Sequence, residues 1–290
     1  MQTLIEVLKL EQANGVALGH FNVADLVLLK AVFEAARDLK VPVLVGASEG
    51  EREFAGTRQL AALVKTLREE FDYPIFLNAD HTHSLAKAVE AVKAGFDSVV
   101  FDLSSLPVDE NIRQTKEAVV ALKSINPSVL VEGEIGDIGT GSEIHKDAPR
   151  IARPLTTPAE AQQFVAATRI DVLAPAVGNS HGMRMSMVTG NEKKHLAIDR
   201  IREIKAAAGV PLTLHGGSGT SDEDLKAAIL TGINIVHINT ELRLAWRRGL
   251  EQGLAARMDE VVPYKILPFA VSSVQQVVSS RLQLFTHPAA

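Results

Sequence analysis

Eight short apolar segments rich in β-branched residues recur along this chain of 290 residues, and helical patterns separate them. The predicted strands span residues 16–23, 41–48, 74–80, 98–104, 129–136, 172–180, 211–217 and 234–240. The clearest helical patterns span residues 24–40, 84–95, 108–125 and 222–232. Strand–helix alternation repeated in this way favours an α/β fold, a single closed (β/α)8 TIM barrel. A doubly wound open sheet is the alternative, and it usually has fewer strands.

The composition agrees with one large domain. Hydrophobic residues make up 46% of the chain and aromatic residues only 4%, so valine, isoleucine, leucine and alanine must fill the core. Such a core suits parallel strands covered by helices. No linker rich in serine, proline or glycine is long enough to divide the chain, so we expect one domain over residues 1–290.

Charge and cysteine content exclude several classes of partner and site. The net charge of -5 argues against a nucleic-acid partner, and no apolar run has the length of a membrane span. The N-terminal segment MQTLIEVLKLEQANG predicts a short amphipathic helix rather than a signal peptide. Because the chain has no cysteine, disulfides and thiolate ligands are excluded, and a cytoplasmic location is expected. Any metal must be held by histidine, aspartate or glutamate.

Polar side chains gather where the predicted strands end, at the edge where (β/α)8 barrels carry their active sites. The segment NADHTHSL (78–85) places Asp80, His81 and His83 where an apolar strand ends. The polar residues at the ends of later strands are Glu132, Glu134, His181, Gly182, His215, His237, Asn239 and Thr240. Three of these histidines and one glutamate are therefore expected to converge from four strands. A single histidine is weak evidence for a ligand, but this set suits Zn²⁺ or a similar divalent ion.

A glycine-rich turn that leads into a helix follows the seventh predicted strand, HGGSGTSDEDL (215–225). Its backbone N–H groups and the Ser218 hydroxyl group could hold an anion, and Asn239 and Thr240 offer further donors. Barrels commonly bind phosphate between strands seven and eight. A tight turn that needs flexible glycines is the alternative interpretation. Beside a cluster of metal ligands, the phosphate site is the better one.

A divalent metal beside a phosphate pocket suits polarisation of a carbonyl group on a phosphorylated sugar. Asp80 adjoins a ligand and is itself free to transfer a proton. This combination predicts that a carbon–carbon bond is made or broken through an enediolate. Two polar connections, residues 137–158 and 182–196, are longer than usual and are expected to form lids over the site.

Several segments together resemble the class II, metal-dependent family of fructose-bisphosphate and tagatose-bisphosphate aldolases, over nearly the whole chain. The segments are FNVADL (21–26), GASEGE (46–51), ADHTHS (79–84), AGFDSVVFDLSSLPVDENIRQTKEAV (94–119), VEGEIGDIG (131–139), GNSHG (178–182), HGGSG (215–219) and INTELR (238–243). The last four, found in this order, are specific to the family. The resemblance implies a carbon–carbon lyase that reversibly cleaves a ketose 1,6-bisphosphate, of fructose or tagatose type, to dihydroxyacetone phosphate and glyceraldehyde 3-phosphate.

The resemblance also implies roles for individual residues. His81, His181 and His215 would bind Zn²⁺, and Glu134 would be a fourth or alternate ligand. Asp80 would protonate the aldehyde oxygen in condensation and deprotonate the hydroxyl group in cleavage.

On the substrate side, the resemblance implies a phosphate site formed by Gly182, Ser218, Asn239 and Thr240. A monovalent cation, Na⁺ or K⁺, would bind near Gly182 and Gly216. The family also implies a homodimer or homotetramer.

Some positions depart from the family pattern. The loop after the fifth strand reads GTGSEIHKDAPR (139–150) where the family usually has G-G-x-E-D, and Glu143 is the acid nearest to the position of the family's proton-abstracting residue. The loop after Gly182 reads MRMSMVTGNEKKHL (183–196) and lacks the family's Tyr-Lys pair. His237 replaces an asparagine that orients the ketose, and Arg281, in a tail without the usual glycines, is a candidate to reach a neighbouring subunit.

Two other functions stay open at this point. A metal-dependent hydrolase of the H-x-H barrel type would use His81 and His83 as paired ligands. However, its H-x-H motif would be expected after strand one rather than strand three. A non-catalytic phosphosugar-binding subunit on the same barrel is the second alternative, which the altered loops motivate and the three histidines oppose.

Overall fold

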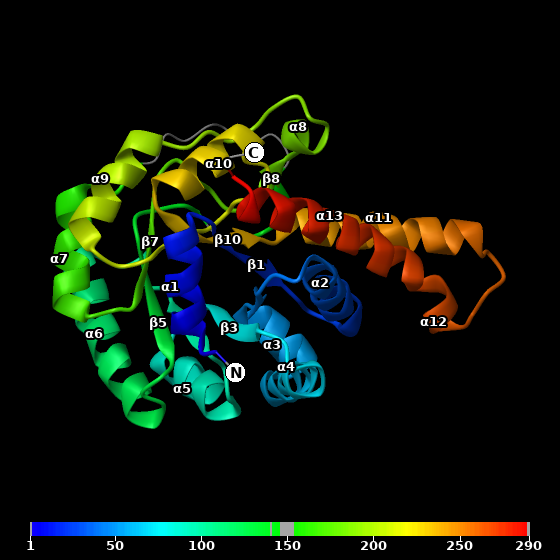
Figure 1. The fold of residues 1–290 in the computed structure, drawn as a ribbon, viewed down its shortest axis with the longest axis horizontal. Coiled ribbons are helices and arrows are strands. Elements are labelled where there is room, and N and C mark those ends of the chain that lie inside the picture. The colour runs from blue at the N-terminus through cyan, green and yellow to red at the C-terminus, as the bar shows by residue number, and fades with distance from the viewer. Residues whose placement is uncertain (1, 140, 146–153, 289–290) are drawn as a thin grey trace.

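The main body of the protein is one closed parallel barrel of eight strands, in the order β1-β10-β9-β7-β5-β4-β3-β2 (Figure 1). The computed structural model describes residues 2–139, 141–145 and 154–288. The barrel strands are β1 (Leu18–Asn22), β2 (Val43–Ala47), β3 (Ile75–Thr82), β4 (Ser98–Phe101), β5 (Leu130–Ile135), β7 (Val172–Pro175), β9 (Leu212–Leu214) and β10 (Ile233–Ile238). Each overlaps one predicted strand, and the predicted TIM barrel is confirmed.

Helices surround the barrel and connect its strands (Figure 1). They are α2 (Leu26–Leu39), α3 (Glu49–Ala55), α4 (Thr57–Phe71), α5 (Leu85–Ala94), α6 (Val108–Ile125), α7 (Pro158–Thr168), α9 (Ile198–Ala208), α10 (Asp222–Thr231), α11 (Thr240–Ala256) and α13 (Pro268–Thr286). Side-chain caps begin several of them. Asp25 accepts from the N–H group of Leu28 at 2.8 Å, and Ser221 accepts from that of Asp224 at 3.1 Å. Each cap contributes roughly 1 kcal/mol.

The apolar core has two parts. The larger lies between the strands and the surrounding helices, with fully buried side chains such as Phe96, Phe164 and Leu122. The smaller fills the lower interior of the barrel with Leu18, Leu44, Phe76, Leu130, Val172 and Ile235. Helix α1 (Leu4–Asn14) packs Leu4, Val7 and Leu8 against this inner cluster. The predicted N-terminal helix therefore closes the end of the barrel where the strands begin, and the opposite end is left for the polar residues.

Described parts of the two long connections pair with each other at that opposite end, whereas residues 146–153 of the first predicted lid lie outside the described residues. Strand β6 (Ile144–His145) pairs in parallel with β8 (Met183–Arg184), and the short helix α8 (Met185–Val188) follows. The contact is close, because a Cβ atom on Gly182 would lie 2.3 Å from Nε2 of His145. The predicted lids thus support each other by a small sheet at the mouth of the barrel.

Several strands are shorter than predicted, and β7 is among them. Strand β7 ends at Pro175, whereas the sequence pattern extended it to residue 180. The Asn179 side chain accepts from the N–H group of Val177 at 2.8 Å, and Gly178 has φ of 98°. This turn ends the strand and carries residues 180–182 across the mouth of the barrel.

Helices α11 and α13 extend beyond the barrel as an antiparallel pair, with α12 (Pro263–Ile266) at the tip (Figure 1). Gly249 and Gly253 of α11 let the helices approach closely, since a Cβ atom on Gly249 would lie 2.6 Å from Cα of Ala270. Among the helices of the described part of the chain, none combines the length and hydropathy that a membrane crossing requires.

Candidate metal centre and phosphate pocket

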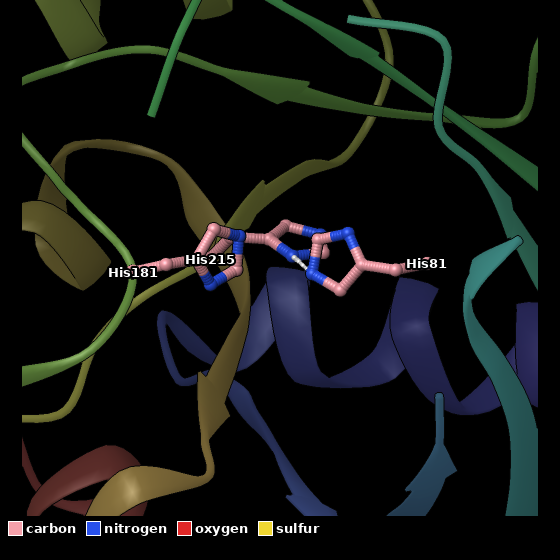
Figure 2. Close-up of side chains that lie close together, drawn as sticks. All are labelled: His81, His181 and His215. Carbon is pink, nitrogen blue, oxygen red and sulfur yellow. Dashed lines mark hydrogen bonds between the residues drawn. The ribbon is translucent and has the colours of Figure 1, made fainter. Parts of the chain in front are cut away.

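Three histidines from separate segments point toward one another at the mouth of the barrel (Figure 2). His81 lies at the end of β3, His181 in the connection after β7, and His215 directly after β9. Each offers one ring nitrogen, and the three nitrogens lie within 4.8 Å of one another. The structure therefore brings together all three histidines that the sequence predicted, in an arrangement that one cation could bridge.

The end of β3 is irregular, and this irregularity aims its side chains. The pairing between β3 and β4 shifts register between Ala79 and Thr82, and His81 has φ of 36°, in the left-handed region. Such a bulge re-aims side chains that would otherwise alternate between faces. As a result Asp80 and His81, although adjacent in sequence, both reach the pocket.

Buried carboxylates hold two of the three rings by their second nitrogen. Nδ1 of His81 lies 2.9 Å from Asp102, and Nε2 of His215 lies 2.6 Å from Glu132. These contacts leave Nε2 of His81 and Nδ1 of His215 facing each other, 3.2 Å apart. A carboxylate behind a histidine is the usual support of a metal ligand, because it fixes the tautomer and the ring orientation.

Burial and nearby carboxylates together determine the charge of these histidines. It lowers the pKa of His215 to about 3 and holds that of His181 well below its usual value, so both rings are neutral at neutral pH. Burial alone would also lower the pKa of His81, but the charges of Asp80 and Asp102 raise it to about 10. Two of the rings are thus already in the form that binds a metal, and the third must release a proton to do so.

Glu134 is buried beside His81, near the ring nitrogen that contacts Asp102. Its Oε2 atom lies 3.7 Å from Nδ1 of His81 and has no hydrogen-bond partner among the described residues. Burial, together with the charge of Asp102, raises the pKa of Glu134 well above its usual value. Glu134 groups with His81 and Asp102 rather than with His181 and His215. A cation nearby would stabilise the ionised form of Glu134, which burial disfavours.

Asp80 lies next to the histidine cluster and is held in a fixed orientation. Its Oδ2 atom accepts from Asn22 at 2.9 Å, and Asn22 also donates to Glu51 at 2.8 Å. Burial alone would raise the pKa of Asp80, but His81 and His237 hold it well below its usual value. Its Oδ1 atom makes no hydrogen bond to the described residues, although Nδ1 of His237 is 3.4 Å away. Asp80 is therefore an ionised base with one free oxygen.

His237 stacks on a second buried histidine below the pocket. The rings of His20 and His237 are 3.4 Å apart between centroids and within 3° of parallel. Burial lowers the pKa of His20 to about 3 and that of His237 to about 4, so the stacked rings are neutral at neutral pH. The ring of His20 therefore supports the ring of His237, which stands where the family resemblance implies an asparagine.

The phosphate residues predicted from the sequence lie around the same pocket. Its lining includes Gly182, Gly216, Ser218, His237, Asn239 and Thr240, beside Asp80 and the three histidines. The Ser218 hydroxyl oxygen accepts from the N–H groups of Asn239 at 3.3 Å and Glu241 at 3.4 Å. These contacts join the glycine-rich turn to the start of α11, where the positive end of the helix dipole favours an anion.

Two residues considered from the sequence lie outside the cluster. Glu143 is exposed, and its neighbour Ser142 lines the pocket instead. The side chain of His83 is 57% exposed, and its Nδ1 atom contacts the backbone oxygen of Asp102 at 3.0 Å. His83 belongs to none of the groups of described residues that could hold a metal.

Arg281 bonds within its own chain. It contacts Glu241 at 2.8 Å and Asp222 at 2.6 Å, and Glu241 in turn accepts from the N–H group of Gly219 at 2.8 Å. The C-terminal helix thereby holds the glycine-rich turn. These ion pairs lie within one chain, and a contact of Arg281 with a neighbouring subunit stays a prediction.

Asp102 and Asn22 were not among the residues predicted for the site. Both follow the rule used for the other residues, because Asp102 directly follows β4 and Asn22 ends β1. The signal was present, but their partners His81 and Asp80 could be recognised only from the structure.

A closed (β/α)8 barrel with a histidine cluster that could hold a metal is typical of metal-dependent barrel enzymes. Comparison with known proteins gives the family. The model of the family "Fructose-bisphosphate aldolase class-II" matches residues 2–288. A probable fructose-bisphosphate aldolase of Bacillus subtilis is 34% identical over 98% of this chain and 96% of its own length. The fructose-bisphosphate aldolase of Thermus caldophilus is 33% identical over 98% of this chain and 97% of its own.

A solved structure agrees with these matches. The YdjI aldolase of Escherichia coli K12 superposes with a TM-score of 0.82 at 27% identity, covering 98% of this chain and 97% of its own. The chain therefore belongs to the class II fructose-bisphosphate aldolase family and is a carbon–carbon lyase. The family implies a divalent metal and a phosphosugar substrate, and the buried histidines could hold such a metal.

Proposed function

We propose that this enzyme is a zinc-dependent aldolase that reversibly cleaves a ketose 1,6-bisphosphate, of fructose or tagatose type, to dihydroxyacetone phosphate and glyceraldehyde 3-phosphate. The observation that carries the proposal is the common pocket of His81, His181 and His215 with Gly182 and Ser218. It joins a candidate metal centre to a candidate phosphate site. The names of the Bacillus and Thermus relatives favour the fructose type.

The three histidines would hold Zn²⁺ or another divalent ion, with Glu134 as the fourth or an alternate ligand. The donor set fits, because it offers imidazole nitrogens and a carboxylate and leaves a position open for substrate. The buried oxygens without partners, Oε2 of Glu134 and Oδ1 of Asp80, also fit a nearby cation. Bound there, a divalent cation would polarise the ketose carbonyl group and stabilise the negative charge that develops on it.

Asp80 would carry out the proton transfer at the reacting hydroxyl group. In cleavage its free Oδ1 atom takes the proton of the C4 hydroxyl, the C3–C4 bond breaks, and the electron pair passes to the dihydroxyacetone half. In condensation the same carboxyl group returns the proton to the aldehyde oxygen. Asn22 orients the carboxylate through Oδ2 at 2.9 Å, which leaves Oδ1 available.

Glu143 would exchange the proton at C3 of dihydroxyacetone phosphate. Its side chain is exposed at the edge of the β6–β8 sheet, so it must turn inward to reach that carbon. The adjacent Ser142 lines the pocket, and its carbonyl oxygen accepts from Arg243 at 3.2 Å, so the segment that carries Glu143 lies at the site.

The phosphoryl group of the dihydroxyacetone half would be bound by Gly182, Gly216, Ser218, Asn239 and Thr240. The start of α11 contributes the positive end of its helix dipole, which favours an anion. His237, which lies between this site and Asp80, would contact the ketose in place of the family's asparagine.

Two alternatives are less consistent with the molecule. A hydrolase of the H-x-H type would need His83 at the metal, yet this side chain is largely exposed and lies outside the described metal-binding groups. Replacing His83 with alanine should abolish a hydrolase and leave an aldolase largely active. A non-catalytic subunit would have no need of the supported histidines, and family membership opposes it as well.

The chain would act as a single domain over residues 1–290, in the cytoplasm, as a homodimer or homotetramer. Exposed apolar side chains at the tip of the α11–α12–α13 arm support self-association. Met258 is 86% exposed, Val261 87% and Tyr264 76%, and a second copy of this chain would cover them.

A coupled cleavage assay with a panel of phosphorylated ketoses tests the proposal. The panel contains fructose 1,6-bisphosphate and tagatose 1,6-bisphosphate, with fructose 6-phosphate as the control that lacks the C1 phosphate. We expect cleavage of a bisphosphate, loss of cleavage with a chelator, and recovery on addition of Zn²⁺. Zinc-loaded protein that cleaves none of them, or cleavage unaffected by the chelator, would contradict the proposal.

A further inference from the structure

The side chain of Lys194 is buried among backbone carbonyl groups beside the phosphate pocket. Its Nζ atom donates to the carbonyl oxygens of Ser180 at 2.6 Å, Gly182 at 2.6 Å and Gly216 at 3.0 Å. Only 6% of the residue is exposed. The carbonyls come from two segments, the connection after β7 and the turn after β9, which also carry His181 and His215. Lys194 therefore joins the two segments that build the site.

The backbone places Lys194 firmly. Its N–H group donates to the carbonyl oxygen of Gly219 at 2.9 Å, and its own carbonyl accepts from Ser221 at 3.2 Å. These bonds form a parallel bridge between Lys194 and Thr220. The segment is thus paired with the glycine-rich turn, and the side chain reaches back from there to Gly216.

The carbonyl cluster has the chemistry of a monovalent cation site. Backbone carbonyl oxygens are the groups that replace the hydration shell of K⁺ in proteins. An ammonium group is also a cation, and its three N–H donors match the three carbonyls one to one. A separate Na⁺ or K⁺ near Gly182 and Gly216, which the family resemblance implies, does not fit these residues. It would need the same oxygens and would be repelled by the ammonium charge.

We propose that the ammonium group of Lys194 is a built-in monovalent cation, which takes the place of Na⁺ or K⁺ beside the phosphate site and makes the enzyme independent of either ion. Its positive charge lies one peptide group from the pocket lining at Gly182 and Gly216, so it also favours a bound phosphoryl group. This second effect rests on the proposed function, whereas the replacement of the ion does not.

Burial and a nearby carboxylate act in opposite directions on the charge of Lys194. Burial lowers the pKa of Lys194 to about 7, while the nearby carboxylate of Glu241 acts in the opposite direction. A phosphoryl dianion in the pocket would raise this lowered pKa back toward its usual value, because an opposite charge favours the ammonium form.

Salt dependence separates this role from a purely structural one. The wild type, Lys194→Ala, Lys194→Met and the exposed control Lys193→Ala are compared in NaCl, KCl, NH₄Cl and choline chloride at equal ionic strength. The measurements are ketose bisphosphate cleavage, thermal unfolding temperature and divalent metal content. Alanine opens space for an ion, whereas the methionine side chain fills it.

We expect the wild type and Lys193→Ala to have equal rates in all four salts. In choline chloride, Lys194→Ala should lose about tenfold or more in kcat/KM, the scale of a set of charge-assisted hydrogen bonds. K⁺ or NH₄⁺ should restore this loss and raise the unfolding temperature of Lys194→Ala selectively, because an ion that binds the native state stabilises it. In Lys194→Met, K⁺ or NH₄⁺ should neither restore the rate nor raise the unfolding temperature. The divalent metal content should be unchanged in all variants.

Three results would overturn the proposal. They are a wild type that needs K⁺ or Na⁺, a Lys194→Ala variant as active in choline chloride as the wild type, and a loss that no monovalent cation restores. The wild-type comparison stands even if the variants do not fold. The unfolding measurements need no substrate, so failure of the proposed aldolase reaction is distinguishable from failure of this inference.

Discussion

Nε2 of His81 lies 3.2 Å from Nδ1 of His215, although the two residues are 134 positions apart in sequence. The second nitrogen of each ring is held by a carboxylate, Asp102 for His81 and Glu132 for His215. The free nitrogens are therefore fixed in place before any ligand binds. Such preorganisation is what a metal site requires.

Replacing His181 or His215 with alanine should remove metal binding and cleavage together, because two remaining imidazoles cannot hold the ion tightly. We expect less than about 0.1 metal ion per purified chain. The control is His195→Ala, in the same connection but with a side chain 75% exposed. Elemental analysis and the coupled assay measure both properties, and a variant that keeps its cleavage rate would show that the histidine is not a ligand.

Glu132→Gln and Asp102→Asn should weaken metal binding without removing a ligand. Each change takes away the negative charge behind a histidine, and loss of such a partner typically costs about 10–100-fold in metal affinity. Competition with a chelator measures the affinity directly. If both variants bound the metal as tightly as the wild type, these carboxylates would have no part in holding the rings.

Asp80→Asn should retain the metal and lose the reaction. The amide keeps the size of the side chain but cannot take a proton, and general-base catalysis typically contributes about 10²–10⁴-fold to the rate. We expect kcat to fall within that range, with metal content unchanged. A fall in kcat of less than about threefold would be far smaller than that contribution, and it would exclude Asp80 as the proton-transfer residue.

Gly216→Ala should disturb substrate binding through the backbone. A Cβ atom there would lie 2.3 Å from the carbonyl oxygen of Ser180, and φ is 63°. Gly209→Ala is the matched control, because its φ is 68° but nothing lies within 4 Å. The control should lose only about 1–2 kcal/mol of stability from the left-handed conformation. Gly216→Ala should in addition raise KM for the bisphosphate, and equal KM values in the two variants would argue against a phosphate role for this turn.

The sequence predicted the barrel because its strands and helices are locally encoded. The predicted helix at residues 108–125 matches α6 to the residue, since apolar spacing is continuous and Pro107 precedes it. The three histidines could be predicted for a similar reason. In a barrel all strands end at one edge, so residues at strand ends must meet.

The remaining contacts depend on loops, where no periodic pattern constrains position. Lys194 lies in a polar connection, and nothing in its sequence indicates that its side chain turns back to Gly216. Glu143 was predicted from its place in a family motif, yet its side chain is not among those that line the described pocket. The positive φ of His81 is likewise set by the register shift in β3 rather than by residue type.

The most direct test of the account is X-ray diffraction at the zinc absorption edge from crystals of the zinc-reconstituted enzyme. The account predicts one anomalous peak at the barrel mouth, about 2.0–2.1 Å from a ring nitrogen of each of His81, His181 and His215. A peak bound elsewhere, or three histidines that do not share one ion, would contradict it.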